Sequence, residues 1–75
     1  MREITNIIEL KRLLNQGQHI EAVNRRLYDR GKALGRNFLK VEAIESDTQF
    51  LISDGVFRGG GWITREIKNF RFFAR

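Results

Sequence analysis

The positive charge of this chain is concentrated in one stretch, residues 24–40, which reads NRRLYDRGKALGRNFLK. The window holds six cationic side chains and one carboxylate, so its net charge of +5 equals the formal net charge of all 75 residues. Cations gathered on one surface are typical of nucleic-acid binding, because each one that neutralises a phosphate releases counterions. The window predicts phosphate contacts by Arg25, Arg26, Arg30, Lys32, Arg36 and Lys40.

The same charges have a simpler interpretation as the solvated face of an amphipathic helix. Glu21 and Asp29 stand three or four residues from Arg25 and Arg26, which is the spacing of ion pairs along a helix. The sequence leaves open whether these arginines are paired within the chain or available to a partner.

A second group of basic and aromatic residues closes the chain, in WITREIKNFRFFAR, residues 62–75. Aromatic rings on an exposed sheet can stack on unpaired bases while arginine holds the backbone. Most of the phenylalanines are expected in the core, since a small domain needs large apolar groups to fold. Trp62, which follows Gly59–Gly61, is the aromatic residue most expected at the surface, and we predict Trp62 and Arg65 as secondary contacts.

The residue types of most catalytic and metal sites are scarce. The chain has no cysteine and one histidine, His19, so thiolate ligands and a thiol nucleophile are excluded and no triad is signalled. Gly59–Gly61 lack the lysine of a phosphate-binding loop. We expect no catalytic residue, no metal and no cofactor, and therefore no enzyme. One alternative stays open, a small ribonuclease that works by electrostatic stabilisation with Tyr28, Arg30, Glu66 and Arg71.

Two helices are predicted at the N-terminus, joined by a short turn into an antiparallel hairpin. The first spans about 6–16, with Asn6 as its cap and Gly17 as its stop. Its apolar arc is wider than one sheet can cover, which indicates a protein interface formed by Ile4, Ile8 and Leu13.

The second helix is predicted over about 19–34. It places four apolar residues on one face and the cations on the other, provided that it continues through Gly31. These four residues are Ile20, Val23, Leu27 and Leu34. A helix-turn-helix that reads DNA with His19, Asn24, Arg25 and Arg26 is a further alternative.

After residue 36 the apolar period changes from 3.6 to 2, which indicates strands. Strands are predicted over 37–45 and 49–53, with a turn at 46–48. Asp54–Gly55 is a hairpin signal, VFR at 56–58 begins a third strand, and one or two more follow in 62–75. Gly59–Gly61 are predicted to form a bulge or loop.

The fold class that follows is α+β in a single domain, 1–75, with the helical hairpin followed by a three- to four-stranded antiparallel meander. A small SH3-like barrel is the alternative arrangement. Hydrophobic residues make up 41% of the chain and charged residues 31%, which is typical of a globular protein. No apolar run reaches the ~18 residues of a membrane span, so we expect no membrane partner and a cytoplasmic location. We expect Met1 to Arg75 to be a complete small reading frame.

The function predicted from the sequence is non-enzymatic binding of DNA or RNA through the phosphate backbone, with weak sequence preference. The alternative is a protein-interaction module, a small regulator or inhibitor that docks on a larger partner or forms a homodimer.

Overall fold

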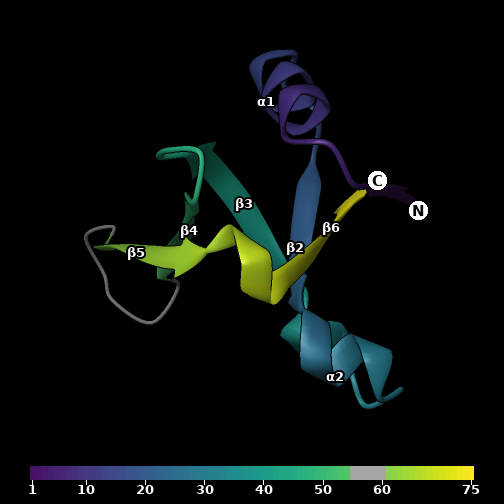
Figure 1. The fold of residues 1–75 in the computed structure, drawn as a ribbon. Helices are drawn as coiled ribbons and strands as arrows, with labels where there is room; N and C mark the ends of the chain where they lie inside the picture. Colours follow the sequence, from purple (N-terminus) through teal and green to yellow (C-terminus); the bar gives the residue numbers. More distant parts are fainter. Residues whose placement is uncertain (55–60) are drawn as a thin grey trace.

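The computed structural model describes residues 1–54 and 61–75, which form one six-stranded antiparallel sheet in the order β1-β6-β2-β3-β4-β5 (Figure 1). Two helices and two short 3-10 helices, η1 and η2, accompany the sheet. In chain order the elements are β1 (Arg2–Ile4), α1 (Ile7–Asn15), β2 (Ile20–Asn24), α2 (Arg25–Asp29), η1 (Gly35–Asn37), β3 (Leu39–Ile44), β4 (Gln49–Asp54), β5 (Gly61–Glu66), η2 (Ile67–Asn69) and β6 (Phe70–Ala74).

The first predicted helix is present as α1. The Asn6 side chain caps it by accepting hydrogen bonds from the backbone N–H groups of Ile8 at 2.7 Å and Glu9 at 3.3 Å. The chain turns away at Gly17, whose φ of +79° lies in the left-handed region that favours glycine. Local capping signals therefore positioned this helix correctly.

The predicted second helix over 19–34, and with it the helical hairpin, is wrong. Residues 20–24 form the strand β2, and only Arg25–Asp29 are helical, as α2. β2 lies between β6 and β3, and it is buried on both faces, with Ile20 and Ala22 on one side and Val23 on the other. A strand covered on both faces loses the strict alternation of apolar and polar residues, so its pattern also matches a helix.

The meander prediction is wrong in extent. β3, β4 and β5 do follow one another as antiparallel neighbours, but the chain then crosses to place β6 between β1 and β2. Strands β1 and β5 form the two edges of the sheet, so the closed barrel is also wrong. The predicted Asp54–Gly55 turn, the strand start at 56–58 and most of the predicted glycine bulge at 59–61 lie outside the described residues, although Gly61 belongs to β5.

The sheet is strongly curved around its main core. Phe50 of β4 is fully buried, and its ring meets those of Phe70 and Phe72 edge-on at centroid distances of 5.1 and 4.9 Å. β4 and β6 are separated in the sheet by two strands, so these contacts require the sheet to curl. A register shift between Val41 and Ala43 in β3 marks the bend.

The two helices cover opposite faces of the sheet, and Figure 1 shows the strands between them. Leu10 and Leu13 of α1 belong to the main core, which includes Phe72. Tyr28 of α2 packs instead on Phe73, the next residue of β6, at a centroid distance of 5.2 Å. Successive side chains of a strand point to opposite faces, so α2 covers the face that α1 leaves open. Neither helix combines the length and the apolar character needed to cross a membrane, and this holds for all described residues.

Candidate nucleic-acid interface

The position of α2 is set by contacts on its inner side. The Asn24 side chain caps the helix by accepting a hydrogen bond from the backbone N–H of Leu27 at 3.1 Å. Tyr28 contacts Phe73 and lies 6.5 Å from the ring of Phe38, edge-on. These contacts hold a helix of five residues that would be unstable in isolation.

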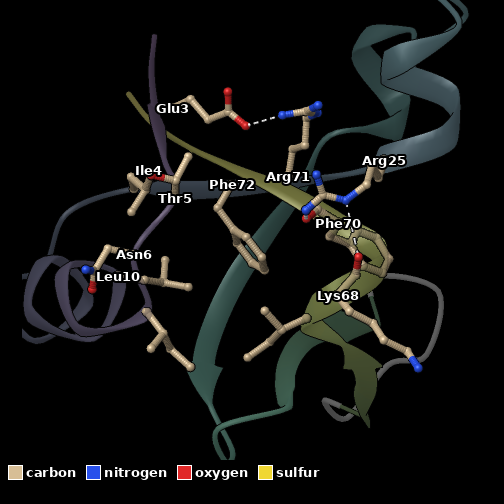
Figure 2. A pocket seen from close by; sticks show the side chains of 12 residues that line it. Glu3, Ile4, Thr5, Asn6, Leu10, Arg25, Lys68, Phe70, Arg71 and Phe72 are labelled. Carbon is tan, nitrogen blue, oxygen red and sulfur yellow. Dashed lines mark hydrogen bonds and ion pairs between the residues drawn. The ribbon is translucent and has the colours of Figure 1, made fainter.

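An ion-pair network adds a second connection between α2 and the sheet. The guanidinium of Arg71 on β6 donates to Asp29 of α2 and to Glu3 of β1, each at 2.8 Å; the pair with Glu3 is drawn in Figure 2. Arg71 also lies over the Tyr28 ring, 5.8 Å from its centroid. The hydrogen bonds to Asp29 and then Glu3 raise the pKa of Arg71 above its ordinary value, so this residue stays charged.

Arg25 connects the start of α2 to the region where η2 meets β6. Its Nε donates to the carbonyl oxygen of Lys68 at 3.2 Å, and its Nη2 donates to the carbonyl oxygen of Phe70 at 3.1 Å. Figure 2 shows this guanidinium reaching across to the backbone, while the side chain of Lys68 extends toward solvent. Arg25 is therefore a cation held in place by the fold.

Two adjoining hollows lie beside α2. The four-cation hollow has a volume of about 410 Å³ and is lined by cations from three elements: Arg25, Arg26, Arg65 and Lys68. The α2 hollow has a volume of about 430 Å³ and is lined by Arg26, Arg30 and Lys32. Both share Asn24 and Arg26, and none of the described residues lining either is a carboxylate. We name the combined set of six cations the cationic surface.

Several of the described carboxylates pair with cations outside the cationic surface. Arg2 and Arg12 pair with Glu9, Lys11 pairs with Asp47, and Arg75 pairs with Glu21. Among residues 1–53 and 62–75, no salt bridge includes a member of the cationic surface. Such a group of like charges produces a positive potential that attracts anions.

The pairing of Glu21 and Asp29 with Arg25 and Arg26, considered from the sequence, is not what the structure shows. Glu21 is on β2 and contacts His19 at 3.0 Å and Arg75 at 3.5 Å, and Asp29 pairs with Arg71. The strand at 20–24 removes the helical spacing between Glu21 and Arg25. Arg26 and Asp29 keep that spacing within α2, but Asp29 pairs with Arg71 instead.

Five of the eight predicted contact residues line the two hollows, and three do not. Arg36 is exposed in η1, and Lys40 is exposed on β3 in register with Glu21 of β2. Trp62 is 61% exposed. It lies on the opposite face of β5 from Arg65, because side chains alternate along a strand and the two residues are three positions apart. Sequence reasoning did not select Lys68, whose place beside α2 depends on the crossing of the chain through η2.

Of the three residues predicted at a protein interface, Ile4 and Leu13 lie in the core and Ile8 is 74% exposed. The apolar surface that motivated a protein-interaction module is therefore reduced to one residue of that set. The helix-turn-helix alternative is wrong because Ile20–Asn24 form a strand, so His19 precedes a strand and Asn24 ends it.

The residues considered for a ribonuclease site do not all lie together. Arg71 and Tyr28 lie together, but Arg71 is engaged by two carboxylates, and Glu66 lines a separate hollow with Asp47 and Thr48. Within the described residues no group of three or more His, Asp or Glu side chains is placed to hold a metal ion. Searches against family models, curated proteins and solved structures found no match for this chain.

Proposed function

We propose that this protein binds nucleic acid through the phosphate backbone and that it is not an enzyme. The observation that supports this function is the cationic surface itself, six cations around two adjoining hollows whose described lining contains no carboxylate. The cytoplasm stays the expected location on the sequence argument alone.

The cations are expected to contact phosphates with little sequence preference. Backbone contacts supply affinity and orientation without reading base edges. Each phosphate that is neutralised changes the slope of log K against log salt by about −0.9 on duplex DNA and about −0.7 on single strands. Binding should therefore weaken steeply as salt rises.

The test compares two triple variants that remove the same charge. Arg26→Ala, Arg30→Ala and Lys32→Ala together are expected to lower affinity at least tenfold at low salt, since they remove about three phosphate contacts. The control, Arg2→Ala, Lys11→Ala and Arg12→Ala, removes three cations that pair with carboxylates on the α1 side of the molecule.

Binding is measured by fluorescence anisotropy with labelled duplex DNA and single-stranded RNA at two salt concentrations. Equal losses in the two triple variants would show that net charge alone drives binding and would contradict the assignment. Absence of binding at low salt would refute the proposed function.

A further inference from the structure

The pocket shown in Figure 2 lies between α1, β1, η2 and β6, next to the four-cation hollow. Its volume is about 290 Å³. Apolar side chains from four elements line it: Ile4, Leu10, Ile67 and Phe72. Thr5 and Asn6 lie on the side of α1, and Arg25 and Arg71 lie on the opposite side. We call this space the Figure 2 pocket.

The Figure 2 pocket and the four-cation hollow have three residues in common, Arg25, Lys68 and Phe70. Arg25 is therefore part of the boundary between an apolar pocket and a cationic hollow. Its guanidinium is fixed by two backbone carbonyls, and Arg25 lines both spaces. A ligand with a flat apolar part joined to an anion matches this arrangement.

We infer that the Figure 2 pocket takes one unpaired base of a nucleic-acid strand and that the four-cation hollow takes the phosphate attached to it. The inference rests on the proposed function and specifies a single-stranded ligand. The pocket volume of about 290 Å³ is at the lower end of the range for small-molecule sites, about 300–1,000 Å³, which favours a small ligand group such as one base. Guanidinium planes stack on bases, and Arg25 is one of the residues that line this pocket.

A duplex cannot fill both the Figure 2 pocket and the four-cation hollow. Its bases are paired and stacked, so its phosphates can contact the cationic surface while the Figure 2 pocket stays without a base. Single strands should therefore bind more tightly than a duplex at the same salt concentration. The expected ratio is about tenfold or more, which corresponds to the lower range for one stacked base.

The experiment uses a mixed-sequence 12-nucleotide RNA, the DNA strand of the same sequence, and the corresponding DNA duplex. Thr5→Trp fills the pocket from an exposed position at its rim. The control is Thr64→Trp, at an exposed threonine on the opposite face of β5 from Arg65. Thr5→Trp should lower single-strand affinity to the duplex level and leave duplex binding unchanged, while Thr64→Trp should change neither.

A second measurement needs no variant and applies even if Thr5→Trp does not fold. Methyl NMR signals of Ile4, Leu10 and Ile67 should shift when the single strand is added and stay in place with the duplex. Equal affinity for strand and duplex, or methyl signals unmoved by a strand that binds, would overturn the inference and leave the proposed function standing.

A competition experiment tests whether the base and phosphate belong to a strand or to a free nucleotide. A nucleoside monophosphate should compete only weakly, because a strand also contacts Arg26, Arg30 and Lys32 in the α2 hollow. A monophosphate that binds as tightly as the 12-nucleotide strand would overturn the assignment to a strand. If neither strand nor duplex binds at low salt, the proposed function fails together with the inference.

Discussion

Replacing Phe50 by alanine tests whether curvature of the sheet holds this fold together. Phe50 has no exposed surface and touches two further rings, so its truncation leaves a cavity that β4 alone cannot close. Phe→Ala in a core costs about 3–5 kcal/mol, and we expect about 4 kcal/mol here. The total stability of a 75-residue domain is about 4–11 kcal/mol at 0.05–0.15 kcal/mol per residue. The variant should therefore melt about 15–30 °C lower, or fail to fold.

Urea and thermal unfolding followed by circular dichroism measure this loss. Phe38→Ala is the matched control, because Phe38 is only partly buried and belongs to the small aromatic cluster on the α2 face. It should cost about 2 kcal/mol or less. If Phe50→Ala does not fold, a double-mutant cycle of Phe50→Leu with Phe72→Leu should give a coupling of about 0.5–1.5 kcal/mol. Equal losses for Phe50→Ala and Phe38→Ala, or no coupling, would refute the curved packing.

Three further changes test the local structure and the interface. Asn6→Ala removes the cap of α1 and should lower the free energy of unfolding by about 1 kcal/mol in urea titrations, whereas Asn6→Ser should restore most of it. Gly17→Ala meets no neighbouring atom, so its whole effect should be the strain of a positive φ, about 1–2 kcal/mol in the same assay. Arg25→Lys keeps the charge but loses the fork that reaches two carbonyls, so in anisotropy titrations it should weaken nucleic-acid binding more than Arg30→Lys does, at an unchanged salt slope.

The sequence located those parts of the fold that depend on neighbouring residues. The cap at Asn6 and the stop at Gly17 bounded α1, and the change of period after residue 36 indicated strands where β3 and β4 stand. The error at 19–34 arose because IEAVN is a central strand, and its burial on both faces is a property of the whole sheet. No local pattern shows that β6 will cross to cover β2.

The candidate site was predictable to the extent that it lies within one segment. Arg25, Arg26, Arg30 and Lys32 were selected from the charge of residues 24–40, and they line the two hollows although the long helix expected to carry them is absent. Lys68 approaches them through pairing of β6 with β2, over a sequence separation that charge counting does not detect.

The ion pairing across the sheet explains why residues 24–40 present more positive charge than their composition implies. Asp29 is the one carboxylate in that window, and Arg71 of β6 engages it on the inner side of α2. A cation from outside the window thus neutralises its anion, while the arginines on the outer side keep no described carboxylate partner. Asp29 stands one turn from Arg25 and Arg26 within α2, but its carboxylate pairs with Arg71 rather than with them. Asp29, which anchors α2 to β6, is thereby kept apart from the arginines on the outer side of the helix.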